Sequence, residues 1–358
     1  MSKRAKITLG EIADIITGPF GSQLHKSDYV QSGIACIMPQ NIGNRTLNTE
    51  GISFVSEEDA ERLKRYTVKE NDIVYARRGD VEKHAYIYHA DCGALCGTGC
   101  MRVRVNPSKA SPLYVSFYLN RPETKRWISQ HAVGSNMPNI NSGILSEVSL
   151  CLPIIHEQEN IAKLLEWIDK KIQNNNRICA ELESMAKTIY DYWFVQFDFP
   201  DENGKPYRTS GGEMIWNDQL KREIPKGWEV GNLCDIANFT NGLACQKYRP
   251  KDGESSLPVI KIKEMHEGIT NDTERVSANI PTKNKISDGD ILFSWSATLE
   301  VMYWFGGDGG LNQHIFKVLP AAYFTKEYVF HQLSAYVINF VKMAEARKTT
   351  MGHITTDH

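Results

Sequence analysis

The chain contains few of the residue patterns that enzyme or metal sites require. The one cluster with metal-ligand spacing is formed by Cys92, Cys96 and Cys100. Structural zinc sites often place their first two ligands two to four residues apart, so a zinc site stays an alternative. However, no His-x-His lies nearby and the stretch leads into an expected strand, which favours three cysteines that pack in the interior. We therefore predict that the chain binds no metal.

Several reaction classes also lack their signatures. There is no Asp/Asn-Pro-Pro-Tyr/Phe segment of the kind that clamps a flipped adenine, and no Gly-x-x-x-x-Gly-Lys-Ser/Thr phosphate loop. Neither His-Glu-x-x-His nor Gly-x-Ser-x-Gly occurs. The sequence thus favours a binding protein over an enzyme, so we expect no catalytic residues in this chain.

Composition sets the broad class. With 358 residues, 41% of them hydrophobic, the chain is long enough for two or three globular domains. No apolar run approaches the roughly 20 residues of a membrane span, and the N-terminus does not read as a secretory signal. Eight cysteines do not form a disulfide framework, which is typical of a cytoplasmic protein with reduced thiols. A net charge of −2 excludes a histone-like polycation but not a local basic surface.

An internal repeat organises the sequence. Leu9 to Ala13 returns as Leu233 to Ala237, 224 residues later, and four further blocks recur in the same order. They pair residues 70–75 with 288–293, 97–107 with 310–320, 114–119 with 328–333, and 137–140 with 351–354. A period this long indicates a duplicated domain rather than a solenoid.

Each copy has mixed secondary structure. Residues 34–38, 72–76 and 101–105 are β-rich and partly alternating, which predicts strands, and residues 9–17 read as a short helix or strand before the turn at Gly18 and Pro19. Apolar residues at helical spacing predict a helix over 112–131 and a counterpart over 327–341. The expected fold class is α+β, with two duplicated units.

Between the copies lies a heptad pattern. Apolar residues recur at alternating steps of four and three, which predicts a long helix with a coiled-coil seam. A helix from about residue 157 to 195 would extend about 58 Å, so we expect it to pair with a partner helix rather than form part of a bundle inside one domain. Asn175 either fixes the register of that pairing or marks a weak point. The seam consists of Ile161, Leu165, Ile168, Ile172, Asn175, Leu182 and Ile189.

These features resemble the specificity (S) subunit of type I restriction–modification systems. The phrases that carry the resemblance are Leu-x-x-Ile-Ala in both copies, the Glu157-Gln158 opening of the helix, its Trp193 to Pro200 closing, and Ile224 to Trp228. The resemblance spans nearly the whole chain. It implies domains at 1–152 (first target recognition), 153–197 (heptad helix), 198–230 (structured linker) and 231–358 (second target recognition).

The resemblance also implies partners and cofactors. The family reads a split site on double-stranded DNA and directs adenine methylation or ATP-dependent cleavage by methyltransferase (M) and restriction (R) subunits. S-adenosylmethionine, ATP and Mg²⁺ would then be bound by those partners, and none by this chain. The sequence departs from the pattern at its end, where no second heptad helix follows the second copy. We therefore expect the long helix to pair with a second copy of itself, with another specificity chain, or with the M subunit.

Residues that could read DNA are Arg, Lys, Asn, Gln, Ser and Thr on loops that differ between the copies. Arg77 and Arg78, directly after an expected strand, are the strongest candidates for guanine contacts; residues 41–45 are a further candidate stretch. For the first half-site we predict Ser22, Gln23, Lys26, Arg77, Arg78, Ser135, Asn136 and Asn139. For the second half-site we predict Gln246, Lys247, Arg249, Ser294, Arg347, Lys348, Thr349 and Thr350.

Two other functions remain open at this point. A stand-alone DNA-modifying enzyme with an unrecognised site would transfer methyl groups or cut DNA without partners. A coiled-coil scaffold unrelated to DNA would show no salt-dependent affinity for a duplex.

Overall fold

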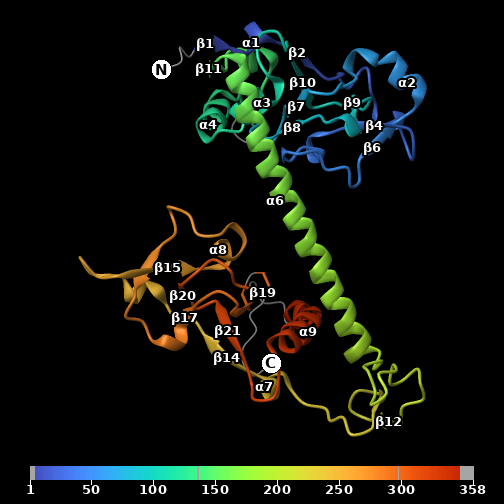
Figure 1. The fold of residues 1–358 in the computed structure, drawn as a ribbon, viewed down its shortest axis with the longest axis vertical. Helices are drawn as coiled ribbons and strands as arrows, with labels where there is room; N and C mark the ends of the chain where they lie inside the picture. The colour runs from blue at the N-terminus through green and yellow to red at the C-terminus, as the bar shows by residue number, and fades with distance from the viewer. Residues whose placement is uncertain (1–4, 135–136, 297, 347–358) are drawn as a thin grey trace. The chain divides into compact units, whose positions relative to one another are not determined.

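The computed structural model describes residues 5–134, 137–296 and 298–346 (Figure 1). The chain divides into two compact units, Met1–Arg177 and Ile178–His358, and the long helix α6 (Ile155–Tyr190) crosses the boundary between them. Each unit is an α+β structure with its own hydrophobic cores. The predicted fold class, two duplicated α+β units with a long helix between them in the chain, is confirmed.

The first unit is built on a five-stranded sheet of order β2-β10-β7-β8-β5. Its strands are β2 (Ala13–Thr17), β10 (Cys100–Val105), β7 (Ile73–Ala76), β8 (His84–Tyr86) and β5 (Asn44–Arg45). A second sheet contains β3 (Tyr29–Val30), β6 (Ser53–Val55), β4 (Ile34–Ile37) and β9 (Leu95–Cys96), and β1 (Ala5–Thr8) pairs with β11 (Ser149–Leu152). The helices before α6 are α1 (Leu9–Ile12), α2 (Glu57–Arg62), α3 (Pro112–Leu119), α4 (Pro122–His131) and α5 (Ser142–Ser146).

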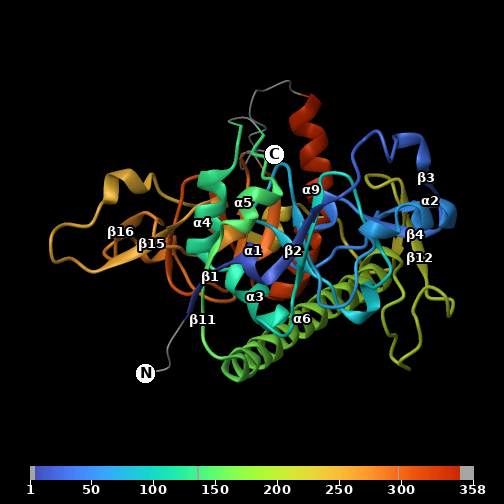
Figure 2. The same cartoon turned by 90° about the horizontal axis from the view of Figure 1, so that it is seen from above.

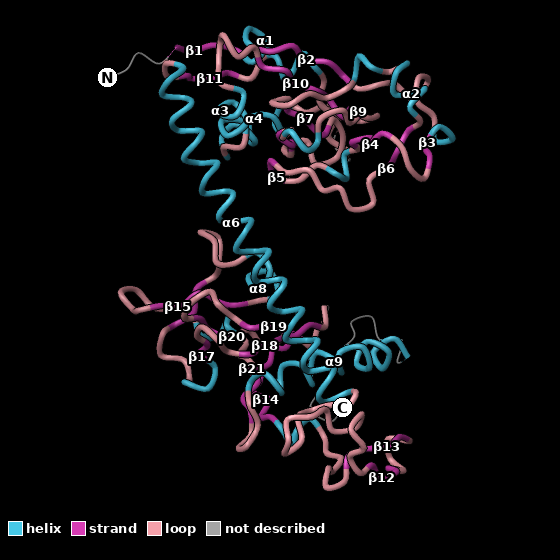
Figure 3. The backbone as a smooth tube through the Cα atoms, turned by 45° about the vertical axis from the view of Figure 1, so that its right-hand side comes forward, coloured by secondary structure: helices cyan, strands magenta, loops and turns pink. Residues whose placement is uncertain are grey.

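The five-stranded sheet has a core on each face. Tyr75 and Met101 belong to the core that α3, α4 and α5 cover, whereas Val74 and Cys100 belong to the core beneath the smaller sheet. Neighbouring strand residues point to opposite faces, so consecutive apolar residues fill both cores. Figures 1 and 3 show α3 and α4 on one side of β7 and β10, with β4, β6 and α2 on the other.

The structure corrects the single helix expected over 112–131. Two helices form, because Pro122 has no N–H to donate to the preceding turn and its ring disfavours a helical conformation at Arg121. Arg121 is extended, with φ −65° and ψ 141°, and Pro122 is the first residue of α4.

The second unit repeats the frame of the first. Its main sheet has the order β14-β21-β18-β19, and a smaller sheet has the order β16-β15-β20-β17. The strands are β14 (Ala237–Asn241), β15 (Ser256–Ile260), β16 (Arg275–Ser277), β17 (Lys285–Ile286), β18 (Ile291–Ser294), β19 (Glu300–Tyr303), β20 (Gly309–Leu311) and β21 (Ile315–Pro320). The helices are α7 (Leu233–Ile236), α8 (Ile262–Glu267) and α9 (Lys326–Ala346).

Strand order shows that the sequence repeat is also a structural repeat. The order β2-β10-β7-β8 in the first unit matches β14-β21-β18-β19 in the second. In both units, one pair of the smaller sheet is parallel, β4 with β9 and β15 with β20. The two units therefore share a topology, and their differences are concentrated in the connections between strands.

The long helix begins at the segment that contains the Glu157-Gln158 motif. Figure 2 shows the chain passing from β11 into the first turn of α6. Gln158 is buried there; its Oε1 accepts from the Ser111 N–H (3.0 Å) and its Nε2 donates to the Pro153 carbonyl (2.8 Å). This glutamine thus fixes the start of α6 to the start of α3.

The helix ends in an aromatic cluster within the second unit. After Tyr190 the backbone forms one π-helical segment, Asp191–Val195. The Trp228 ring stacks on Phe199 at 5.2 Å between centroids and contacts Phe197 edge-on at 5.4 Å. The hairpin of β12 (Met214–Asn217) and β13 (Arg222–Pro225) occupies the expected structured linker, shown among loops in Figure 3. None of the described helices combines the length and apolar character that crossing a membrane requires.

Candidate nucleic-acid interface

Three loops of the first unit meet at the end of β7. We define the first loop cluster as residues 18–24, 77–81 and 133–140, without residues 135 and 136. Backbone hydrogen bonds hold it together: Gly18 N–H donates to the Cys100 carbonyl (2.9 Å), and Ile140 N–H donates to the Arg77 carbonyl (3.0 Å). Gly79 N–H also donates to the Pro138 carbonyl at 3.1 Å. Segments distant in sequence therefore form one surface at one end of the sheet.

Arg77 and Arg78 both lie in this cluster. Arg77 is half-buried, its Nε is buried without a hydrogen-bond partner, and its guanidinium carbon lies 5.9 Å from the centroid of the Phe20 ring. Arg78 is exposed, and its guanidinium makes no hydrogen bond or ion pair with any residue that the structure describes. The exposed Arg78 guanidinium therefore keeps its donors available for an acceptor outside the chain, and the buried Arg77 Nε lacks a partner within the described residues.

The other first-half candidates divide into three groups. Asn139 belongs to the cluster, where its backbone exchanges two 2.9 Å hydrogen bonds with Val133, and its Oδ1 is buried without a partner. Ser22 and Gln23, also in the cluster, and Lys26, just outside it, are exposed, but the Gln23 Oε1 already accepts from the Tyr66 hydroxyl at 3.0 Å. Ser135 and Asn136 lie outside the described residues.

In the stretch 41–45, Asn41 and Arg45 place their side chains in the interior, whereas Asn44 is exposed. Asn41 is buried, with its amide nitrogen donating to the Asn48 carbonyl at 3.1 Å. Arg45 is buried as well; its Nε donates to Ser116 Oγ at 3.1 Å, and it forms an ion pair with Asp169 of α6. These two side chains hold the domain together and offer little surface to a ligand.

In the second unit the corresponding loops carry different residues. Gln246, Lys247 and Arg249 are exposed on or just after the short 3-10 helix Cys245–Tyr248. Ser294 is fully buried, and its hydroxyl donates to the Ser296 carbonyl at 3.3 Å, so in this conformation it presents no surface to DNA. The candidates Arg347, Lys348, Thr349 and Thr350 lie outside the described residues.

The position equivalent to Arg77 is Trp295. Its indole Nε1 donates to Asn241 Oδ1 at 3.3 Å, and its ring lies 5.6 Å from that of His314. An indole offers one donor, whereas a guanidinium offers five, so the two units present different chemistry from the same place in a shared frame. The sequence difference between the copies is therefore located at the ends of matched strands.

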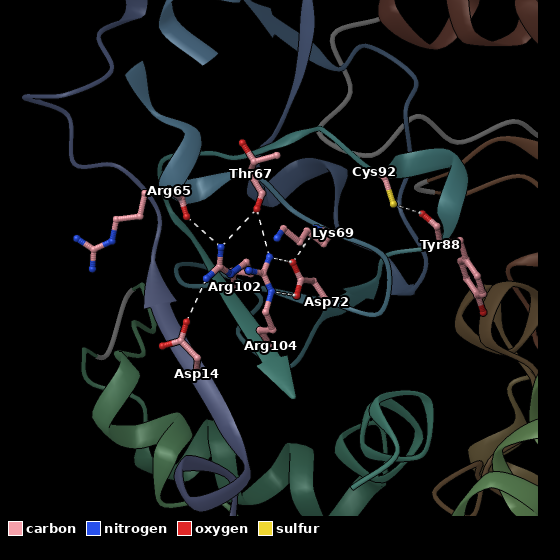
Figure 4. A network of polar contacts seen from close by, with 9 residues as sticks. All are labelled: Asp14, Arg65, Thr67, Lys69, Asp72, Tyr88, Cys92, Arg102 and Arg104. Carbon is pink, nitrogen blue, oxygen red and sulfur yellow. Dashed lines mark hydrogen bonds and ion pairs between the residues drawn. The ribbon is translucent and has the colours of Figure 1, made fainter. Parts of the chain in front are cut away.

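A charged network stabilises the opposite end of β7. Figure 4 shows Arg104, whose Nε and Nη2 donate to the Asp72 carboxylate at 2.7 and 2.6 Å. Asp72 is buried and also accepts from the Lys69 N–H at 2.7 Å. The neighbouring Arg102 donates to the carbonyls of Arg65 and Thr67 and to Asp14.

This network is repeated in the second unit and is structural. There Lys317 forms an ion pair with Asp290 at 2.8 Å, and Asp290 accepts from the Ser287 N–H at 2.8 Å. A carboxylate thus fixes the start of the same strand in both units, while the other end of that strand carries the variable loops.

The three cysteines with metal-ligand spacing do not share one environment. Cys96 and Cys100 are buried and Cys92 is exposed, and no group of metal-type ligands occurs among the described residues.

The predicted seam of α6 is largely exposed to solvent. Leu165 is half-buried, and Asn175 is exposed. The other seam residues are exposed apolar side chains, namely Ile161, Ile168, Ile172, Leu182 and Ile189. A stripe of this length on one helix is typical of a surface that pairs with another helix.

Sequence reasoning missed the apolar part of the first loop cluster. Phe20, Val133 and Met137 are all exposed there. The turn residues Gly18 and Pro19 could have marked Phe20 as a loop residue, but no local pattern shows whether such a ring is buried. Sequence reasoning also missed the buried group of Arg45, His84 and Ser116, which comes together only in the folded domain.

Matched α+β units with different loop clusters, connected in the chain by a long helix, define a duplicated recognition scaffold. Comparison with known families gives the same class: the model described as type I restriction modification DNA specificity domain matches residues 1–184. The chain belongs to the family of type I restriction–modification specificity subunits.

Individual relatives agree. Over 154 residues the chain is 29% identical to the type I restriction enzyme MjaIX specificity subunit of Methanocaldococcus jannaschii, covering 43% of this chain and 34% of that protein. It is 22% identical over 333 residues to the HindI specificity subunit of Haemophilus influenzae, covering 78% and 72%. The match thus spans about a third of the first relative's length.

A solved structure supports the fold. The crystal structure of a type I restriction–modification S subunit from M. genitalium matches with a TM-score of 0.56 at 14% sequence identity. The match covers 99% of this chain and 84% of that one. At this identity the comparison shows a shared fold.

Proposed function

We propose that this chain is the DNA-reading subunit of a type I restriction–modification complex. One observation carries the proposal: two units with the same strand order place different residues at the same strand end, Arg77 and Arg78 in one and Trp295 and the buried Ser296 in the other. A fixed frame with variable loops suits a protein that reads two unrelated half-sites. Residues 1–152 would read the first half-site and residues 231–358 the second.

In this proposal the chain itself is not catalytic. Adenine methylation and ATP-dependent cleavage belong to the M and R subunits, which would bind S-adenosylmethionine, ATP and Mg²⁺ in the cytoplasm. The sequence supports this division, because it contains neither an adenine-clamping motif nor a phosphate loop.

The first loop cluster can supply both kinds of DNA contact. The exposed Arg78 of this cluster, and the exposed Lys26 just after it in the chain, suit phosphates, which set affinity and register without reading sequence. Arginine can also form a bidentate contact with the N7 and O6 atoms of guanine. Arg77 and Arg78 are the residues proposed to contact bases. The remaining exposed candidates are proposed to contact the DNA backbone and so to position the duplex.

The segment 153–197 is proposed to act as spacer and dock. Its helix α6 has 36 residues, which is about 54 Å at 1.5 Å per residue. The exposed apolar seam provides a surface for a second helix, from the M subunit, another specificity chain or a second copy. Residues 198–230 then form the structured linker to the second domain.

Methylation mapping tests the proposal. The chain is co-expressed with its partner methyltransferase, and methylated adenines are located across the host genome. We expect a single motif made of two separated halves. Arg77→Ala or Arg78→Ala should weaken the discrimination between bases at one position of one half by about 1–3 kcal/mol. If either arginine contacts a phosphate instead, its substitution would weaken binding to all DNA sequences by a similar amount. Methylation by the purified chain alone, or a motif that does not depend on this chain, would contradict the proposal.

A further inference from the structure

Exposed apolar side chains gather on the first loop cluster. Among the described residues of 5–152, four large apolar side chains are exposed, and three of them, Phe20, Val133 and Met137, lie in this cluster at 58%, 67% and 63% exposure. The fourth, Val30, lies on β3. Large apolar groups that gather on one surface mark a contact with another molecule more often than chance exposure does.

The loop that carries Phe20 is fixed by its own backbone. Gly18 begins it, and a Cβ at that position would lie 2.3 Å from the Gly97 carbonyl oxygen, so only glycine fits. The Phe20 carbonyl accepts from the N–H groups of Gln23 (2.8 Å) and Leu24 (3.2 Å). Leu24 is buried in the core, whereas the Phe20 ring four residues earlier remains outside.

Arg77 defines the environment of the ring. Its guanidinium lies over the Phe20 ring at 5.9 Å, within the range of a cation–π contact. A phenylalanine has only two side-chain torsions, so little conformational freedom is lost when such a ring meets a ligand. Phe20 is thus a positioned apolar group beside Arg77, and Arg78 lies in the same loop cluster.

The chemistry of duplex DNA limits what this ring can contact. The phosphates are charged and hydrated, and they gain nothing from contact with an apolar ring. The major groove of an intact duplex offers one apolar group, the 5-methyl of thymine, for which phenylalanine is a suitable partner. Stacking on a base face would first require the base to leave the helix.

We infer that Phe20 is a specificity-determining residue that contacts a thymine methyl group in the first half-site. The inference rests on the proposed function and adds to it a residue and the base that it reads. Ala244 holds the equivalent place in the second unit, so the effect is confined to one half-site.

The test pairs a protein change with a DNA change. The full chain is purified in complex with its methyltransferase, and each thymine of the first half-site is replaced singly with uracil, which lacks only the methyl group. We expect one replacement to weaken binding by the wild-type complex about fourfold, the effect of one buried methyl-sized group. The Phe20→Ala complex binds thymine-containing DNA more weakly and shows no further loss with uracil.

Two further variants complete the design. Phe305→Ala removes an exposed ring from the second unit, and it keeps the wild-type response to uracil in the first half-site. Phe20→Leu retains an apolar group and keeps part of the response, which separates contact loss from misfolding. Wild-type binding that is indifferent to every uracil, or an equal uracil effect in Phe20→Ala, overturns the inference.

The readouts separate this inference from the proposed function. A complex with no sequence preference contradicts the proposed function itself. A complex that binds its motif normally, with additive Phe20 and uracil effects, contradicts only the thymine contact. An increase in 2-aminopurine fluorescence beside the site, without uracil sensitivity, would show that Phe20 stacks on a base and would also overturn the methyl contact.

Discussion

His84 makes the first unit sensitive to acid. This residue of β8 is fully buried, its ring stacks on Tyr75 at 4.9 Å between centroids, and its Nε2 lies 3.1 Å from the Ser116 carbonyl oxygen. Burial, followed by the nearby positive charge of Arg45, lowers the pKa of His84 to about 3. The folded domain therefore holds this imidazole neutral through the mildly acidic range.

The direction and size of the effect follow from proton linkage. In the unfolded chain, His84 takes up a proton below its ordinary pKa of about 6.5, whereas the folded domain does not until about pH 3. Between these values, the unfolded state binds more protons, so the free energy of unfolding falls by about 1.4 kcal/mol per pH unit as pH decreases. From pH 7 to pH 5 the loss from this one residue is about 2 kcal/mol.

Hydrogen exchange of the full chain measures this loss of stability within the first unit. Amides of β7, β8 and β10 report the opening free energy of the first unit at pH 7 and pH 5 after correction for intrinsic exchange. We expect His84→Gln to be less stable than wild type at pH 7 and the gap to shrink by about 2 kcal/mol at pH 5. The exposed His89 gives the control His89→Gln, which should follow the wild-type profile. Parallel pH profiles for wild type and His84→Gln would refute the reasoning.

Three other predictions concern the frame and the helix. Asp72→Ala leaves Arg104 without its buried carboxylate and should lower the stability of the first unit by about 3 kcal/mol, seen as faster exchange in β7 but not in β18; unchanged β7 protection would contradict this. One heptad inserted after Asn175 adds about 10 Å, so mapped motifs should gain about three base pairs of spacer with both halves intact; an unaltered spacer in an active complex would show that α6 does not set the spacing. Ile168→Asp with Ile172→Asp should abolish helix-mediated self-association in sedimentation equilibrium, because each apolar side chain buried in the pairing contributes about 1.5–3 kcal/mol. A wild-type monomer would contradict self-pairing, and a dimer unaffected by both changes would show that its interface lies outside this seam.

Much of the fold could be predicted from sequence because it depends on local pattern. The β-rich stretches at 72–76 and 101–105 became β7 and β10, and the heptad pattern became α6 and the π-helical turn after it. The break between α3 and α4 was missed, although Pro122 provides a local reason for it. The parallel pairing of β4 with β9 could not be read from either strand, because register depends on the assembled sheet.

The candidate site was less predictable because exposure is a property of the whole domain. Arg77 and Arg78 could be proposed because they directly follow a strand, where loops begin. Ser294 was chosen by the same rule in the second copy, yet it is the last residue of β18 and is buried. Phe20 was overlooked because an aromatic residue beside a turn is usually part of the core, and only the fold shows its ring outside.

Domain exchange tests the central claim most directly. Residues 1–152 are replaced with the corresponding domain of a specificity subunit whose motif is known, and methylated adenines are mapped in cells that also contain the partner methyltransferase. The account predicts a hybrid motif in which one half changes to that of the donor while the other half and the spacer stay as they were. A motif altered in both halves, or unaltered in both, would contradict two independent DNA readers on one chain.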